Sequence, residues 1–179
     1  MRESGEARRP ARQGESAGLT HIDAAGNPSM VDVGAKHASE RVAVAGGRIL
    51  LSSTAFDLLV RGGGEKGDPL VVARIAGITA AKQTAALIPL CHPLALDHVD
   101  VSLEPDAALP GVRVTATARV HGRTGVEMEA LTAAAVALLT VYDMLKAVDR
   151  GMTIEGVRLL RKAGGRSGDW EAEPERRSG

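Results

Sequence analysis

The sequence predicts an α+β fold in which helices are packed on one face of an antiparallel sheet. Three observations favour this class. Two short segments alternate apolar and polar residues, as half-buried strands do. A long and mostly apolar helical stretch follows them, and another helical stretch precedes them. Strands and helices mixed in this order are typical of α+β proteins, and a length of 179 residues suits a single domain.

The first half of the chain is expected to form one strand and two helices. The strand covers Arg41–Leu51 and is interrupted at Gly46–Gly47, and a short helix with a serine cap covers Ser53–Val60. The glycines Gly62–Gly64 end this helix. The second helix spans about Pro69–Leu87, because proline suits a first helical turn and the next proline disfavours a helical residue before it.

The second half is expected to contribute three strands and one helix. The alternating segments Val99–Leu103 and Val112–Val120 form two strands, joined by the turn-rich connection Glu104–Gly111. The longest helix follows over Gly125–Val148, and a last strand covers Thr153–Leu160. These elements define a single domain within residues 19–170. Residues 1–18 and 171–179 are expected to be disordered, because they hold too few apolar residues to offset the entropy of ordering.

The composition excludes several classes of function. Lys+Arg and Asp+Glu both number 22, so the net charge is zero and nothing favours binding to nucleic acid or to an acidic membrane. Only Phe56, Tyr142 and Trp170 are aromatic, which argues against recognition of nucleic acid by stacking. The beginning of the chain has no apolar run typical of a signal peptide, and we expect a cytoplasmic protein.

Common catalytic and metal-binding motifs are absent. Cys91 is the single cysteine, so neither an intrachain disulfide nor a cysteine-based zinc cluster can form, and the five histidines show no ligand spacing. We therefore expect no metal site. The sequence also lacks the phosphate-loop and dinucleotide-binding glycine patterns, the nucleophile elbow and the His-Glu-x-x-His helix.

The longest predicted helix carries candidate acid–base residues at both ends. Asp143 and Lys146 are three residues apart and therefore neighbours on one face. They form either an ordinary surface ion pair or an acid–base pair. Near the other end, Glu129 lies within about 40° of Asp143 around the axis but roughly 21 Å away along it. One small ligand cannot touch both in one chain, so they serve different sites or one site assembled from two subunits.

A stiff loop and a small set of lysines supply further candidates. Two prolines bracket Leu90, Cys91 and His92 directly after the second helix. The cysteine suits a small buried side chain, and the histidine suits either a structural hydrogen bond or a ligand contact. Lysine occurs only five times in this arginine-rich chain, and its amine, unlike a guanidinium, can lose a proton at accessible pH. Lys66 and Lys162 are therefore of interest, with an ordinary solvated side chain as the alternative.

Between Leu19 and about Trp170 the chain resembles the cyclic pyranopterin monophosphate synthase family, the molybdenum cofactor biosynthesis protein C. Many uncommon strings in one order carry the resemblance: Leu19–Asp23, Met30–Val33, Lys66–Asp68, Ala73–Gly77, Leu87–Pro93, Gly122–Thr132, Tyr142–Met144, Lys146–Val148, Arg158–Leu160 and Lys162 with Gly164–Gly165.

The resemblance implies a fold, an assembly and a reaction. The family fold is a ferredoxin-like antiparallel sheet, assembled as a homohexamer, a trimer of dimers, with sites at subunit interfaces. Members convert 3',8-cyclo-7,8-dihydroguanosine triphosphate into cyclic pyranopterin monophosphate with release of diphosphate. The substrate is a small molecule derived from a purine nucleotide, and no cofactor is implied.

The resemblance also assigns roles to residues. It implies that Asp143, Lys66 and Lys146 are catalytic. It places two stretches in the substrate pocket, and with Lys162 the implied substrate-binding residues are Leu90, Cys91, His92, Met128, Glu129 and Lys162. Arg41 and Lys36 are weaker candidates for phosphate binding.

The chain departs from the family pattern at few positions, of which Arg166 in place of a usual lysine removes one titratable amine. Two alternative functions stay open at this point. The first is a catalytically idle homologue that acts as a binding or scaffold subunit, although such a copy has no reason to retain all three catalytic residues. The second is a different purine-nucleotide enzyme on the same scaffold.

Overall fold

A computed structural model describes residues 27–62 and 67–173. The chain separates into two compact units, Met1–Val31 and Asp32–Gly179, and the helices and strands all belong to the second unit. Lys66, the extension 1–18 and residues 174–179 lie outside the described residues. The elements in chain order are β1 (Ser39–Leu50), α1 (Ser53–Val60), α2 (Pro69–Lys82), α3 (Thr84–Leu87), β2 (His98–Asp106), β3 (Gly111–Gly122), α4 (Glu127–Leu145), β4 (Thr153–Ala163) and β5 (Trp170–Glu171).

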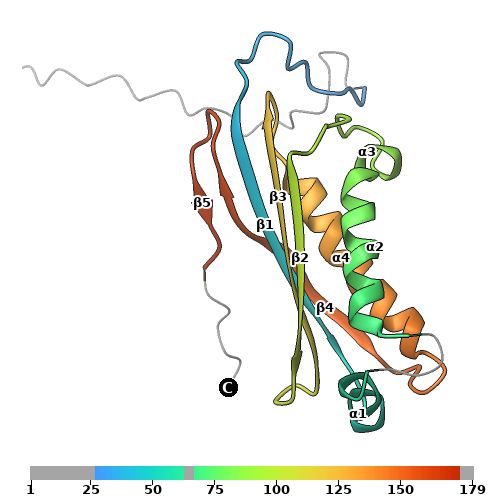
Figure 1. Ribbon diagram of the computed structural model, residues 1–179. Coiled ribbons are helices and arrows are strands. Elements are labelled where there is room, and N and C mark those ends of the chain that lie inside the picture. The colour runs from blue at the N-terminus through green and yellow to red at the C-terminus, as the bar shows by residue number, and fades with distance from the viewer. Residues whose placement is uncertain (1–26, 63–66, 174–179) are drawn as a thin grey trace, which may run out of the picture. The chain divides into compact units, whose positions relative to one another are not determined.

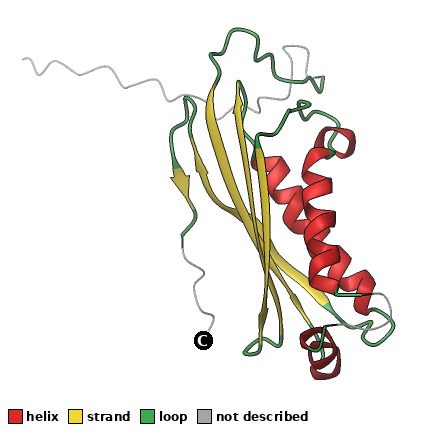
Figure 2. Ribbon diagram, viewed as in Figure 1, coloured by secondary structure: helices red, strands yellow, loops and turns green. Residues whose placement is uncertain are grey.

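The five strands form one antiparallel sheet in the order β2-β3-β1-β4-β5 (Figure 1). Strands β1 to β4 with their intervening helices have the order and connections of the ferredoxin-like βαββαβ motif. The α+β class with helices on one face is therefore confirmed. The long helices α2 and α4 lie side by side on one face of the sheet (Figure 2).

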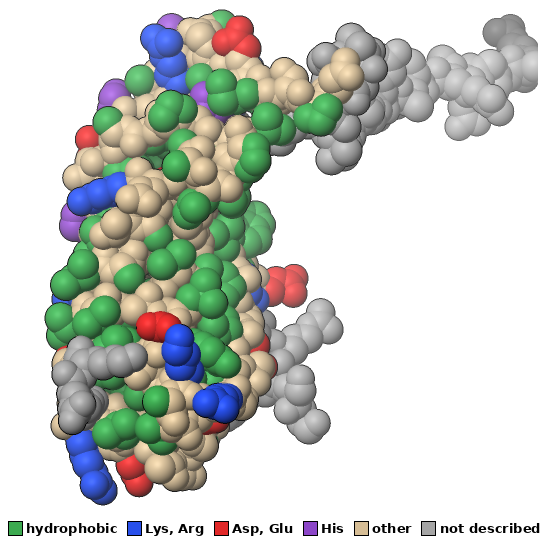
Figure 3. Space-filling model, turned by 90° about the vertical axis from the view of Figure 1, so that its right-hand side faces the viewer, with side chains coloured by type: hydrophobic (Ala, Val, Ile, Leu, Met, Phe, Trp, Pro, Cys, Tyr) green, Lys and Arg blue, Asp and Glu red, His purple; other side chains and the backbone are tan. Residues whose placement is uncertain are grey.

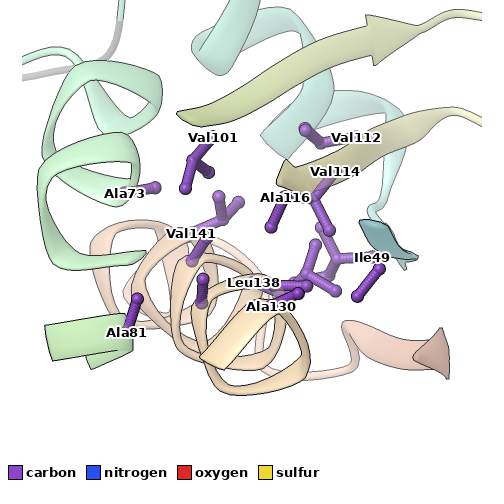
Figure 4. Close-up of a cluster of buried hydrophobic side chains, with 14 of the residues drawn as sticks. Ile49, Ala73, Ala81, Val101, Val112, Val114, Ala116, Ala130, Leu138 and Val141 are labelled. Carbon is purple, nitrogen blue, oxygen red and sulfur yellow. The ribbon is translucent and has the colours of Figure 1, made fainter. Parts of the chain in front are cut away.

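The core lies between this sheet face and the two long helices. Strand β3 alternates strictly, so its apolar side chains point to the helices while Arg113, Thr115, Arg119 and His121 point away. The central side chains of the core are drawn in Figure 4. The residues buried there include Ile49, Val101, Val112, Val114, Ala116, Ala130, Leu138 and Val141.

Alanine rather than aromatic side chains fills the space between α2 and α4. Gly77 shows how close the helices approach, because a Cβ atom there would lie 2.9 Å from the Ala133 carbonyl oxygen and 3.2 Å from the Ala137 Cβ atom. Ala73 and Ala81 are likewise buried on this side of α2. The scarcity of aromatic residues thus reflects a core in which small side chains let the helix backbones approach closely.

The opposite face of the sheet has no helix on it among the described residues. It carries the half-buried side chains of Val42, Val44 and Leu50 from β1. Leu160 of β4 lies on the same face, since its Cδ1 atom is 2.8 Å from the position that a Cβ atom of Gly46 would take. This open face therefore joins apolar side chains from at least two neighbouring strands.

Three details of the prediction are wrong: the interruption of the first strand, the end of the second helix and the length of the connection between β2 and β3. Strand β1 is continuous through Gly46–Gly47, and the irregularity lies instead in its register with β4. The predicted helix Pro69–Leu87 breaks at Gln83, whose backbone leaves the helical conformation (φ −107°, ψ 7°) between α2 and the short helix α3. The predicted connection 104–111 shortens to residues 107–110, since β2 extends to Asp106 and β3 begins at Gly111.

Helix α4 is shorter than predicted at both ends. Val126 adopts a non-helical backbone (φ −122°, ψ 24°), and the chain turns away after Leu145. By length and composition alone, α4 could cross a membrane. Eight of its residues are nevertheless buried against the sheet and α2, as expected of a core helix. The two-residue strand β5, which the sequence did not predict, pairs with the end of β4.

Candidate active site

Helix α4 separates the candidate residues into two clusters. Glu129 lies in its first turn and Asp143 in its last, and the helix is uninterrupted between them. At 1.5 Å per residue the two positions are roughly 21 Å apart along the axis. The structure therefore brings the candidates together in two places rather than one.

The first cluster pairs Glu129 with Cys91. Glu129 is 2% exposed although it carries a carboxyl group, and the Cys91 thiol donates a hydrogen bond to its Oε1 atom at 3.7 Å. The loop after α3 makes this contact possible. The Cys91 amide donates to the Ile88 carbonyl at 3.0 Å, which turns the chain back at the first proline. The half-buried side chains of Leu90 and His92 flank the thiol in sequence.

Burial determines the protonation of this cluster. Burial raises the pKa of the Glu129 carboxyl, and the nearby charge of Glu127 acts in the same direction. Burial also raises the pKa of the Cys91 thiol, with Glu129 as a further cause. Burial therefore favours the protonated form of each group more than water does, while the hydrogen bond from Cys91 acts in the opposite direction on Glu129. Such a carboxyl can donate a hydrogen bond or a proton to a ligand.

We expect Glu129 to make the stability of the protein fall as the pH rises. Its pKa is higher in the folded than in the unfolded chain, so its contribution is complete below about 4.5 and is lost as the pH rises through the folded pKa. The free energy of unfolding falls by about 1.4 kcal/mol for each unit by which the pKa in the folded chain exceeds that in the unfolded chain. The variant Glu129→Gln cannot ionise at this position. Its free energy of unfolding is therefore expected to exceed that of the wild type, and this difference is expected to be larger at pH 8 than at pH 5.

Urea denaturation of both proteins at the two pH values measures this difference. Glu104→Gln is the control, because it removes an exposed carboxyl from β2, away from the buried cluster. An identical pH dependence of stability in the wild type and in Glu129→Gln would contradict the burial argument.

The second cluster is the pair Asp143 and Lys146 at the end of α4. The Lys146 ammonium donates a hydrogen bond of 2.6 Å to Asp143 Oδ1, and the side chains are 53% and 61% exposed for lysine and aspartate respectively. The hydrogen bond from Lys146 and the charge of Asp143 raise the pKa of the lysine amine. Lys146 is therefore held as a cation beside a carboxylate, at a position open to a ligand.

A pocket of about 740 Å³ lies beside the start of α4 and the end of β4. Lys162 projects into it, donates a hydrogen bond of 2.8 Å to the Ser167 hydroxyl and lies 3.7 Å from Glu127 Oε1. Five cationic side chains line the pocket against this single carboxylate: Lys36, Arg41, Arg123, Lys162 and Arg166. Their excess charge makes the pocket suitable for an anion.

Arg41 is built into the wall of this pocket by two glycines. Gly164 and Gly165 have φ values of +89° and +83°, which side chains rarely allow. A Cβ atom on Gly165 would overlap the Arg41 guanidinium. The Arg41 Nε atom is buried, and no hydrogen bond to it is found within the described part of the chain.

The structure thus brings Cys91 to Glu129, Asp143 to Lys146, and Lys162 to Glu127, and it leaves Asp143 far from Glu129. Met128, half-exposed between Glu127 and Glu129, points away from the core. Lys66 lies outside the described residues.

Arg123 is a pocket residue that the sequence did not predict. The signal available was its position in the glycine-containing turn between β3 and α4, opposite the glycines that follow β4. Within residues 27–62 and 67–173, no three His, Cys, Asp or Glu side chains are grouped so as to hold a metal ion.

Comparison with known proteins identifies the family. The sequence profile of the MoaC family matches residues 30–165, which include both clusters and most of the cationic pocket. The chain belongs to the MoaC family. Two relatives named cyclic pyranopterin monophosphate synthase are similar over nearly their whole length. The protein of Methylobacterium sp. (strain 4-46) is 61% identical over 88% of this chain and 99% of the relative. The protein of Methylobacterium nodulans is 60% identical over 87% of this chain and 98% of the relative. The MoaC resemblance inferred from the motifs is confirmed.

Proposed function

We propose that the chain converts 3',8-cyclo-7,8-dihydroguanosine triphosphate into cyclic pyranopterin monophosphate and diphosphate. It is an enzyme of molybdenum cofactor biosynthesis, a lyase that releases diphosphate. The observation that carries this function is the near-complete coverage of two relatives, both named as the synthase, at 60% identity or more. Nothing in the described residues or in these relatives favours an idle homologue.

The Asp143–Lys146 pair is proposed to transfer protons, together with Lys66. The purine-derived ring must be opened by water and closed again as a pterin, which requires groups that give and take protons. A carboxylate and an ammonium 2.6 Å apart can serve as acceptor and donor. Leu90, Cys91, His92, Met128 and Glu129 are proposed to contact the ring system, with the buried Glu129 carboxyl as a hydrogen-bonding group.

The cationic pocket is proposed to bind the phosphates. Formation of the cyclic monophosphate requires an internal oxygen to attack the α-phosphorus while diphosphate leaves. Lys162, Arg41 and Lys36 line this pocket, and their charges are proposed to stabilise the leaving group.

This role predicts that Gly165→Ala weakens substrate binding. The added methyl group would displace the Arg41 guanidinium, and the loss of one charge-assisted contact is expected to raise KM about tenfold or more. Gly168→Ala is the matched control, because φ at Gly168 is also positive (+68°) but no atom lies within 4 Å of the added carbon. Steady-state kinetics with the nucleotide substrate measure both. Equal KM values for the two variants would remove Arg41 from phosphate binding.

The active site is proposed to be composite and the assembly to be a homohexamer, a trimer of dimers. The two clusters on α4 are too far apart for one ligand in one subunit. Apolar side chains are also exposed on the face that carries α2 and α4 (Figure 3), among them Val71, Ile75 and Leu139. This helical face and the open sheet face both offer apolar surface to a second copy.

The remaining proposals concern the environment of the enzyme. The chain is proposed to act in the cytoplasm on a small molecule, without nucleic acid or membrane partners and without a cofactor. The balanced charge of 22 cationic and 22 acidic residues supports the absence of nucleic acid and membrane partners.

An anaerobic assay of the purified protein tests the reaction. Cyclic pyranopterin monophosphate and diphosphate are measured together after addition of the cyclic dihydro-GTP substrate. Equal amounts of both products are expected. If a correctly assembled oligomer forms no product while an active homologue does so in parallel, the protein is an idle homologue.

A further inference from the structure

We propose that Asp149 is a positioning residue for the Asp143–Lys146 pair, because it fastens the loop after α4 to the start of α1. The inference rests on the proposed function, in which this pair transfers protons. Asp149 itself need not touch the substrate.

The side chain of Asp149 joins two parts of the chain that are 97 residues apart. Its Oδ2 atom accepts a hydrogen bond of 2.7 Å from the backbone amide of Ser52, and its Oδ1 atom accepts one of 2.9 Å from the amide of Gly151. Ser52 is the N-cap residue of α1, and its hydroxyl accepts from the Ala55 amide. The loop is thus attached to a residue that is itself fixed by a helix. Figure 1 shows α1 at the same end of the fold as the end of α4 and the start of β4.

The other hydrogen bonds of the loop join it to the last turn of α4, which directly precedes it. The amides of Val148 and Asp149 both donate to the Leu145 carbonyl, at 2.9 and 3.1 Å. The Tyr142 hydroxyl donates to the Arg150 carbonyl at 3.1 Å. These bonds hold the turn against the end of α4 but do not attach it to any other element. Among the hydrogen bonds found for residues 146–151, that of Asp149 to Ser52 is the one that reaches a distant element.

The reacting pair lies directly before this loop, in the last turn of α4 and at its C-cap. The 2.6 Å bond between Lys146 and Asp143 fixes the two groups relative to each other, but both side chains are more than half exposed. Lys146 is also the C-cap residue of α4, where helices tend to fray. Proton transfer requires placement within about 0.5 Å, which packing and hydrogen bonds around the reacting groups must provide.

Asp149 is suited to hold the loop at working pH. The hydrogen bond from the Ser52 amide, followed by that from Gly151, keeps the pKa of the Asp149 carboxyl below its usual range. Both bonds are therefore charge-assisted, and such bonds are stronger than those between neutral groups.

The test compares Asp149→Ala with Asp106→Ala in the complete enzyme. Asp106 is a matched control because its Oδ1 atom also accepts from a backbone amide two residues further on, Ala108 at 2.9 Å, but in the β2–β3 hairpin. Asp149→Ala is expected to lower kcat at least tenfold and to change KM less than twofold, since the pocket and Glu129 lie at the other end of α4. Asp106→Ala is expected to keep both constants. Asp149→Asn retains one acceptor oxygen and is expected to be intermediate, and it replaces the alanine variant if that does not fold.

Hydrogen exchange supplies a readout independent of turnover. Amides of residues 146–151 are expected to exchange faster in Asp149→Ala than in the wild type, and to be unchanged in Asp106→Ala. A wild-type kcat in Asp149→Ala, with an active wild-type enzyme, overturns the positioning role and leaves the proposed function intact. Absence of turnover in the wild type overturns the proposed function instead, which separates the two failures.

Discussion

Asp143→Ala and Lys146→Ala are each expected to abolish measurable turnover while the protein stays folded and assembled. General acid–base groups contribute about 10²–10⁴-fold to a rate, and the losses are expected in kcat. The fold is expected to survive because both side chains are more than half exposed and pair with each other rather than with the core. Stopped assays of both products, with thermal melting and size-exclusion chromatography of the same samples, measure the effect.

The control for this prediction is another exposed ion pair. Arg74 and Asp100 join α2 to β2 at 3.1 Å, with side chains 59% and 49% exposed. Arg74→Ala is expected to retain wild-type kcat, because an exposed pair of this kind contributes little to stability. Near-normal turnover by either Asp143→Ala or Lys146→Ala would remove the proposed role in proton transfer.

The second large effect is expected from mixing two inactive proteins. Glu129→Met fills the buried position without a carboxyl group, and Asp143→Ala lacks the other cluster. If each site takes Glu129 from one subunit and Asp143 from another, equal random mixing leaves about a quarter of the sites with both residues. About a quarter of wild-type activity is therefore expected after exchange of subunits between two inactive samples.

A mixture of Asp143→Ala with Lys146→Ala is the control for this experiment. These two residues lie on the same turn of one helix, so every site in the mixed assembly contains one of the two defects. No activity is expected to return. Verified mixed oligomers of Glu129→Met and Asp143→Ala that remain inactive would contradict the composite site.

The fold was predictable where one local signal dominated. The strict alternation of β3 and a serine cap on α1 were both confirmed, and the structure shows that the cap is Ser52 rather than Ser53. The break at Gln83 was not predictable, because neither glycine nor proline stands at or directly after this residue in the sequence. The continuity of β1 through its glycines depends on pairing with β3 on one side and β4 on the other, which the local sequence does not reveal.

The candidate site was predictable as a set of residues but not as an arrangement. Spacing on one helix was sufficient to pair Asp143 with Lys146 and to separate both from Glu129. The contact between Cys91 and Glu129 joins positions 38 residues apart, and it requires both the turn after α3 and the docking of α2 on α4. The burial of Glu129 has the same origin, since a glutamate in the first turn of a helix is exposed by default.

The nearly aromatic-free core has a practical consequence for spectroscopy. Trp170, the single tryptophan, lies in β5 at the edge of the sheet and is 45% exposed. Its fluorescence reports on whether β5 is paired with β4, and hardly on the alanine-packed interior. Loss of that emission signal on heating measures the detachment of an edge strand. Unfolding of the domain is better followed by circular dichroism, through α2 and α4.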